Sequence, residues 1–143
     1  DDVKVLPGFT GPQNVLKDEV PVFTGGDAEF NTTYVLENIQ FELNSSELMP
    51  ESFFDLDNVV AYLKERPDVS VELSGHTDDQ GETAYNETLS LSRAKRAAAY
   101  LISRGIHQGR ISTSGYGESR PLIHDVTEQA REVNRRVEIR FHR

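Results

Sequence analysis

The chain has 143 residues, enough for one domain with a buried core, and its 15 Lys and Arg against 24 Asp and Glu give a net charge of −9. That balance argues against a nucleic-acid-binding protein, which normally presents a basic patch, and the absence of Cys excludes disulfides, thiolate metal sites and cysteine nucleophiles. The longest apolar stretch, residues 97–102, is far shorter than the roughly 20 residues of a membrane span, so we expect no membrane insertion.

Residues 1–33 are expected to form an extended arm or linker, and residues 34–143 the domain. Turn-forming residues are concentrated in the arm, at Pro7, Gly8, Gly11, Pro12, Pro21, Gly25 and Gly26. The sequence begins without a signal peptide. We therefore expect that a targeting segment has been removed or that the chain is part of something longer.

Residues 39–65 predict a strand followed by a helix. Apolar and polar residues alternate over 39–43, which is the period of a half-buried strand. Pro50 suits the first turn of a helix, and Pro67 marks the end of that helix. The apolar stripe of this helix consists of Phe53, Leu56, Val60 and Leu63.

Residues 69–105 repeat this order. Alternation over 69–73 predicts a second strand, which Gly75 closes, and the polar loop 76–82 leads to a second helix with Thr83 as its expected N-cap. Gly105 suits the C-terminal end of this helix. The core stripe of the helix is Leu91, Ala94, Ala98 and Leu101.

The remaining pattern predicts a strand over 110–116, a short helix over 127–133 and a final alternating strand over 137–141. Alternating strands have one apolar face, so both long helices should cover the same side of the sheet. The expected fold class is an α/β (α+β) sandwich. It has a four-stranded mixed sheet in the order strand, helix, strand, helix, strand, short helix, strand.

The densest polar cluster is the segment 74–81, Ser-Gly-His-Thr-Asp-Asp-Gln-Gly. It lies at the carboxyl end of a predicted strand, where α/β proteins often bind ligands. Asp78 and Asp79 either stabilise a turn through side-chain to backbone hydrogen bonds, or Asp78 contributes to a binding site. The sequence leaves both alternatives open.

Arg93 lies off the core stripe of the second helix. It either lays its stem on apolar neighbours with its head in water, or faces one cleft with Asp78. A carboxylate and a guanidinium held slightly too far apart to pair would suit a ligand with both an ammonium and a carboxylate. The alternative is an ordinary salt bridge worth about 0–1 kcal/mol. Arg135 or Arg136 either positions the Asp78 loop or protects a sheet edge.

Metal binding and catalysis have weaker signals. His76 with Asp78, or His124 with Asp125, could ligate a metal ion, but no ligand spacing such as HExxH is present. The serines near the loop lack the context of a nucleophile elbow. We therefore expect a non-enzymatic protein without a cofactor or a metal.

A series of short motifs follows a characteristic order. They are Ile39-Gln40-Phe41-Glu42-Leu43-Asn44-Ser45-Ser46, Gly75-His76-Thr77-Asp78, Tyr85-Asn86, Leu89-Ser90, Arg93-Ala94, Gly115-Tyr116-Gly117-Glu118 and Asn134-Arg135-Arg136-Val137-Glu138-Ile139. With these motifs, the chain from about residue 35 to residue 143 resembles the OmpA C-terminal-like family, the peptidoglycan-associating domain shared by OmpA, Pal and MotB-type proteins.

The resemblance implies non-catalytic binding of peptidoglycan through the meso-diaminopimelate residue of its stem peptide. Carried over to this sequence, Asp78 would bind the ammonium group of that residue and Arg93 its carboxylate. The other ligand-binding positions implied by the resemblance are Thr77, Asn86, Arg135 and, in the loop after the first strand, Asn44.

The resemblance also implies a periplasmic domain that is associated with the outer membrane and anchors a larger envelope protein to the cell wall. One alternative is a protein–protein adaptor domain of an envelope assembly, in which the wall pocket is vestigial. Another is a wall hydrolase, which would release muropeptides.

Overall fold

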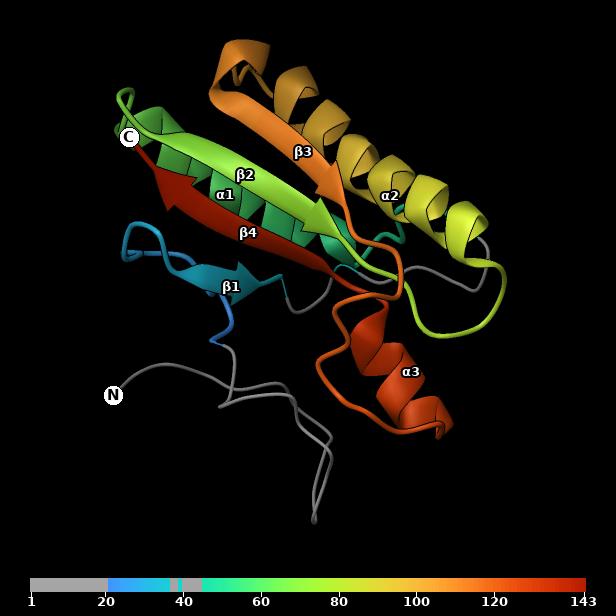
Figure 1. The fold of residues 1–143 in the computed structure, drawn as a ribbon. Coiled ribbons are helices and arrows are strands. Elements are labelled where there is room, and N and C mark those ends of the chain that lie inside the picture. The colour runs from blue at the N-terminus through green and yellow to red at the C-terminus, as the bar shows by residue number, and fades with distance from the viewer. Residues whose placement is uncertain (1–20, 37–38, 40–44) are drawn as a thin grey trace.

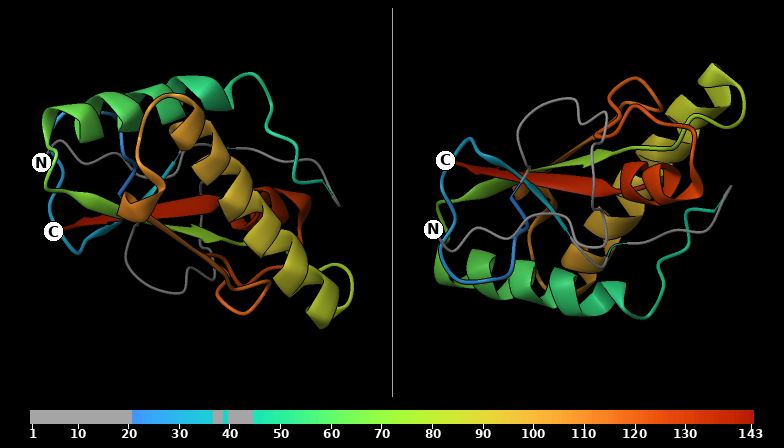
Figure 2. Two further views of the ribbon diagram at one scale, coloured as in Figure 1. Left: turned by 90° about the horizontal axis from the view of Figure 1, so that it is seen from above. Right: turned by 90° about the horizontal axis from the view of Figure 1, so that it is seen from below.

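A mixed four-stranded sheet with two long helices on one face organises the protein (Figures 1 and 2). The computed structural model describes residues 21–36, 39 and 45–143. The strands pair in the order β1-β4-β2-β3, with β2 and β3 parallel and the other neighbours antiparallel. The elements are β1 (Thr33–Val35), α1 (Ser52–Glu65), β2 (Ser70–Gly75), α2 (Thr83–Ser103), a 3-10 turn (Gln108–Arg110), β3 (Ile111–Gly115), α3 (Glu128–Asn134) and β4 (Val137–His142).

The two central strands bury alternate residues. Leu73 of β2 lies opposite Ile139 of β4, and both are fully buried. Glu72 and Arg140 are the next partners along the ladder, and their side chains form an ion pair at 2.9 Å on the other, more exposed face. The alternation in the sequence therefore predicted the buried face of these strands, and the expected fold class is confirmed.

The long helices bury the stripes expected from their sequences, with two exceptions, and one of them is Leu91 of α2, which is only half-buried. Phe53 was expected in the core, but it is 38% exposed and stacks on Tyr100 of α2, with ring centroids 4.9 Å apart. α2 ends as predicted, because Gly105 adopts a φ of +101° and Ile106 N–H donates to the Leu101 carbonyl. No helix in the described part of the chain is long and apolar enough to cross a membrane.

Residues 21–36 pack along the β4 side of the sheet. Phe23 is 2% exposed, and its ring lies 5.1 Å from that of Phe141 and 5.9 Å from that of Tyr62. β1 is a strand that the sequence analysis did not predict. The expected strand at 39–43 lies outside the described residues except for Ile39, which is buried. The boundary at residue 33 stays a prediction, although residues 21–33 share the core rather than extend away from it.

Two glycines let α2 lie directly on the sheet. Gly75 and Gly115 are partners at the carboxyl ends of β2 and β3. A Cβ atom at Gly75 would lie 1.8 Å from the Ser90 carbonyl oxygen, and one at Gly115 would lie 2.4 Å from the backbone nitrogen of Leu91. Any side chain at either position would therefore push the helix away. Arg93 follows Ser90 by less than one helical turn, so this contact also sets the depth of Arg93.

We expect Gly75→Ala to lower the free energy of unfolding by about 2–3 kcal/mol, because α2 must move to admit the methyl group. Urea denaturation followed by circular dichroism measures the loss. Ser112→Ala, at an exposed position of β3, is the matched control and should stay within about 0.5 kcal/mol of the wild type. A Gly75→Ala variant as stable as the control would contradict the close approach of α2.

Candidate functional site

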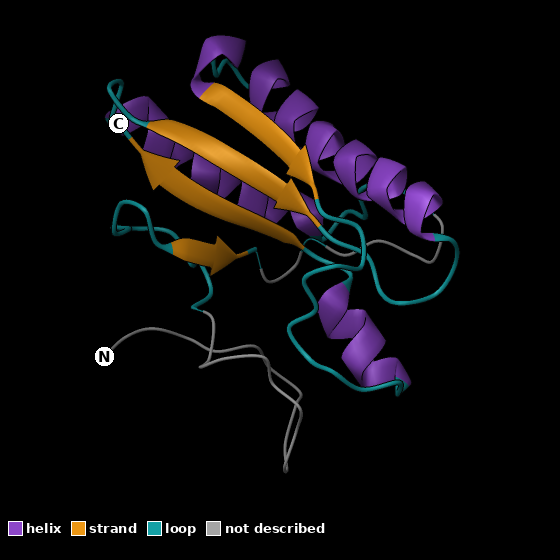
Figure 3. Ribbon diagram, in the orientation of Figure 1, coloured by secondary structure: helices purple, strands orange, loops and turns teal. Residues whose placement is uncertain are grey.

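The loop after β2 lies at the end of the sheet where β2 and β3 finish, close to α3 (Figure 3). Two backbone hydrogen bonds fix its start. His76 N–H donates to the Arg136 carbonyl and Thr77 N–H to the Gly117 carbonyl, both at 2.9 Å. The parallel pairing of β2 and β3 thus brings the loop beside the segment that follows β3, as expected for an α/β unit.

Asp78 is 2% exposed, and both of its carboxylate oxygens have partners. Oδ1 accepts a hydrogen bond from Gln80 N–H at 2.9 Å, and Oδ2 accepts one from Nη1 of Arg135. The turn-stabilising role that the sequence left open is therefore confirmed for Asp78, whereas the Asp79 side chain accepts a hydrogen bond from Arg131. The contact between Arg135 and the Asp78 loop is also confirmed.

Arg135 joins Asp78 to a second carboxylate. Its Nη2 donates to Oε2 of Glu128 at 2.8 Å. Burial works to lower the pKa of Arg135, but the hydrogen bonds to Glu128 and Asp78 outweigh it and raise this pKa. The guanidinium therefore stays charged between two acidic side chains.

Arg93 is 1% exposed, so the alternative in which its head lies in water is wrong. Its Nε donates to the Ser45 carbonyl at 2.9 Å and its Nη1 to the His76 carbonyl at 3.2 Å. It thus links the segment before α1 to the loop after β2. Among the described residues, Asp78 forms its ion pair with Arg135 and not with Arg93.

The charges of Arg93, Asp78 and Arg135 act on one another. Burial and, to a smaller extent, the positive charge of Arg135 lower the pKa of Arg93 to about 10, although the charge of Asp78 opposes both. Arg93 is therefore protonated at neutral pH. The structure thus places the Asp78 carboxylate and the Arg93 guanidinium, which the sequence singled out, near one another. A second guanidinium, that of Arg135, lies between Asp78 and Glu128.

Asn86, in the first turns of α2, is buried and connects the two loops of this site. Its Nδ2 donates to the Gln80 carbonyl at 2.9 Å and to Oε1 of Glu118 at 2.8 Å. Thr77, also buried, donates from its hydroxyl to the Asp78 carbonyl at 3.0 Å. Both expected site residues therefore hold the loop in shape. Asn44 lies outside the described residues.

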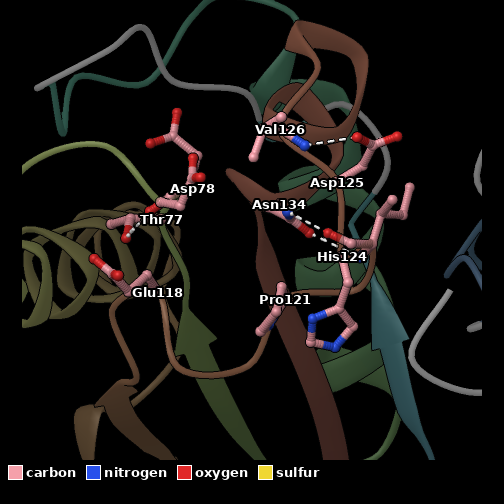
Figure 4. Close-up of a pocket in the computed structure, with 10 residues that line it drawn as sticks. Thr77, Asp78, Glu118, Pro121, His124, Asp125, Val126 and Asn134 are labelled. Atoms are coloured by element: carbon pink, nitrogen blue, oxygen red, sulfur yellow. Dashed lines mark hydrogen bonds between the residues drawn. The ribbon is translucent and has the colours of Figure 1, made fainter. Parts of the chain in front are cut away.

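A pocket of about 250 Å³ opens beside the loop (Figure 4). In the figure, Thr77 and Asp78 lie on one side of it, and Pro121 and His124 lie across from them. Its full lining is Thr77, Asp78, Asp79, Glu118, Pro121, Ile123, His124, Asp125, Val126 and Asn134. In the described part of the chain, no group of three or more His, Asp or Glu side chains is placed to hold a metal ion.

The sequence analysis missed the contribution of α3. Besides Glu128, this helix provides Arg131, whose Nε donates to Oδ1 of Asp79 at 2.9 Å. Glu128, Arg131 and Arg135 are spaced three and four residues apart, which places them on one helical face. That spacing was a usable signal. The acidic partners in the loop after β2, however, are distant in sequence.

A second buried network supports the loop from β4. His76 is 1% exposed, stacks on Tyr116 and has Nε2 3.4 Å from Oε1 of Glu138, while Arg136 donates to the other oxygen of Glu138 at 2.8 Å. Burial lowers the pKa of His76 despite Glu138. Burial acts to raise the pKa of Glu138, but His76 and Arg136 lower it to about 2. Arg136 thus serves this network and not Asp78.

Comparison with known proteins identifies relatives of this arrangement. A model of the OmpA family matches residues 40–135. Outer membrane porin F of Pseudomonas aeruginosa is 35% identical over 128 residues, which cover 89% of this chain and 35% of that protein. Peptidoglycan-binding protein ArfA of Mycobacterium tuberculosis is 34% identical over 133 residues, which cover 93% of this chain and 37% of that protein. The chain thus spans about a third of the length of these curated relatives.

A solved structure shares the fold. The peptidoglycan-associated lipoprotein from Burkholderia pseudomallei superposes with a TM-score of 0.70 at 23% sequence identity, over 73% of this chain and 88% of that chain. At this identity the similarity concerns the fold alone.

We expect acid to destabilise the protein in two stages. The lowered pKa of native His76 means that the unfolded chain binds a proton that native His76 does not bind, so stability falls as the pH drops below about 6.5. The pKa of about 2 for native Glu138 adds a second loss below about pH 4.3. Melting temperatures between pH 8 and pH 3.5 measure both stages.

His76→Phe is the matched variant, because a phenyl ring keeps the stacking on Tyr116 but cannot bind a proton. It should lose the first stage and show a smaller second stage, because only Arg136 then lowers the pKa of Glu138. A variant that melts with the same pH dependence as the wild type between pH 7 and pH 5 would contradict the role given to His76.

Proposed function

The chain belongs to the OmpA family, whose domains are non-catalytic binding domains, and on this premise we propose that it binds peptidoglycan through the diaminopimelate residue of the stem peptide. One observation carries the proposal. Asp78, a buried carboxylate, and Arg93, a buried guanidinium, meet at the loop after β2. Arg93 donates to the His76 carbonyl of this loop, and Asp78 pairs with Arg135, whose charge also acts on Arg93. The printed name of the mycobacterial relative, a peptidoglycan-binding protein, supports the same ligand class.

The ligand would enter as a zwitterion. We propose that its ammonium group donates to Asp78, whose ionised carboxylate has acceptor capacity beyond the bonds to Gln80 and Arg135. Its carboxylate would lie against Arg93, because the planar fork of a guanidinium fits a carboxylate through two parallel hydrogen bonds. Thr77, Asn86 and Arg135 would hold the loop in place for this contact.

Asn44 is proposed as a further contact. It directly precedes Ser45, whose carbonyl oxygen accepts a hydrogen bond from Arg93. The segment before α1 is thus tied to the guanidinium that would read the ligand carboxylate.

The expected affinity for a single stem peptide is moderate. A hydrogen bond to a charged group contributes about 1.5–3 kcal/mol, and two or three such bonds must offset the cost of association. A dissociation constant of roughly micromolar to millimolar follows. Binding to a repetitive polymer would raise the effective strength through avidity.

We propose that the domain acts in the periplasm, where it anchors a larger outer-membrane-associated protein to the cell wall. This proposal is supported by the printed name of the Pseudomonas relative, an outer membrane porin, and by the fraction of that relative that the chain covers.

We expect Asp78→Asn and Arg93→Lys each to reduce co-sedimentation with purified cell-wall sacculi at least tenfold. Asp78→Asn removes the negative charge that would bind the ligand ammonium, and Arg93→Lys keeps the positive charge but removes the planar fork that would bind the ligand carboxylate. Arg96→Lys, at an exposed position of the same helix, is the matched control and should bind as the wild type does. If both site variants bind as strongly as the control, the assignment of the site is wrong. Release of soluble muropeptides would instead reveal a hydrolase.

A stem peptide in which lysine replaces diaminopimelate should bind at least tenfold more weakly, because lysine lacks the carboxylate that Arg93 would bind. Titration calorimetry with the two peptides measures the difference. Equal affinities would show that Arg93 does not bind the carboxylate by which diaminopimelate differs from lysine. Binding of neither peptide would favour a protein–protein adaptor.

A further inference from the structure

Glu128 is the outer end of a chain of ion pairs that starts at the buried carboxylate of Asp78. The side chains become more exposed along it, from 2% for Asp78 and 11% for Arg135 to 62% for Glu128. Arg135 uses one terminal nitrogen for each carboxylate. Glu128 stands at the start of α3, seven residues before Arg135, and therefore two turns away on the same face.

The charge balance of the site depends on this outer residue. Arg93 and Arg135 are both positive, and Arg135 lowers the pKa of Arg93, so the two cations act on each other. Asp78 and Glu128 together offset them. These four side chains have no net charge between them, which suits a ligand group that has one ammonium and one carboxylate. Removing Glu128 would make the charge around Arg135 one unit more positive, which favours the ligand carboxylate and disfavours its ammonium.

We infer that Glu128 is a positioning residue that acts through Arg135 and keeps the Asp78 carboxylate available to a cationic group of the ligand. Glu128 accepts a hydrogen bond from Nη2 of Arg135 and offsets part of its positive charge. Arg135 therefore neutralises the Asp78 carboxylate less than it would without Glu128. Glu128 thereby sets how strongly the site distinguishes a zwitterion from a simple anion. This inference rests on the proposed function.

The neighbouring pair formed by Asp79 and Arg131 provides an internal comparison. It also joins α3 to the loop after β2, with Nε and Oδ1 2.9 Å apart. Its two side chains, at 46% and 23% exposed, are closer to solvent than Asp78 and Arg135, and Arg131 does not contact Asp78 in any hydrogen bond or ion pair of the described residues. It clamps the same loop, and Arg131 and Asp78 act on each other only through space, Asp78 being one of the charges that raise the pKa of Arg131.

The test measures the affinity of the full chain for two ligands at low ionic strength, where the exposed carboxylate is least screened. One ligand is a stem peptide with a free diaminopimelate amine. The other is the same peptide with that amine acetylated, which removes the ammonium charge and leaves the carboxylate. Glu128→Gln removes the charge of the side chain and keeps an oxygen that can accept the Arg135 hydrogen bond.

In the wild type, acetylation should weaken binding about tenfold. In Glu128→Gln, we expect the free-amine peptide to bind on the order of fivefold more weakly, the upper range for a partly exposed ion pair, while the acetylated peptide changes by less than about twofold. In the control, Glu132→Gln, at an exposed position of α3, the effect of acetylation should equal that in the wild type.

A Glu128→Gln variant that weakens both peptides equally would give Glu128 a merely structural role and overturn the inference, while the proposed function would stand. A wild type that binds neither peptide would overturn the proposed function and this inference with it.

Discussion

The close approach of α2 to the sheet is the constraint on which the site depends. Where β2 and β3 end, Gly75 and Gly115 leave room for the backbone of α2 at Ser90 and Leu91, and no side chain larger than hydrogen fits. The hydroxyl of Ser90 then accepts a hydrogen bond from Gly117 N–H at 2.8 Å, which fixes the turn after β3. Because α2 lies so close to the sheet, the Arg93 side chain reaches the His76 carbonyl in the loop after β2.

Two charged networks support the loop after β2 from different sides and do different work. On the side of β4, His76, Arg136 and Glu138 are shielded from solvent, and their contacts stay within the protein. On the side of α3, Arg135 connects the buried Asp78 to the exposed Glu128. The first network therefore affects stability, whereas the second, which opens toward solvent, is suited to a charged ligand.

Much of the fold and half of the candidate site followed from local sequence patterns. Alternation marked the buried faces of β2 and β4, and a carboxylate followed by a helical arginine marked the site. β1 has only three residues and is held by β4, more than 100 positions away, so no local pattern announces it. Burial of Arg93 depends on a carbonyl 48 residues distant. Glu128 was missed because its role appears only when α3 meets the loop.

The central claim is that the buried Asp78 carboxylate and the buried Arg93 guanidinium together bind a ligand group that has one ammonium and one carboxylate. A crystal structure of the protein with a diaminopimelate-containing stem peptide tests it most directly. The account predicts the ligand ammonium within hydrogen-bond distance of Asp78 and the ligand carboxylate against Arg93. A peptide bound without contact to Asp78 and Arg93 would contradict it.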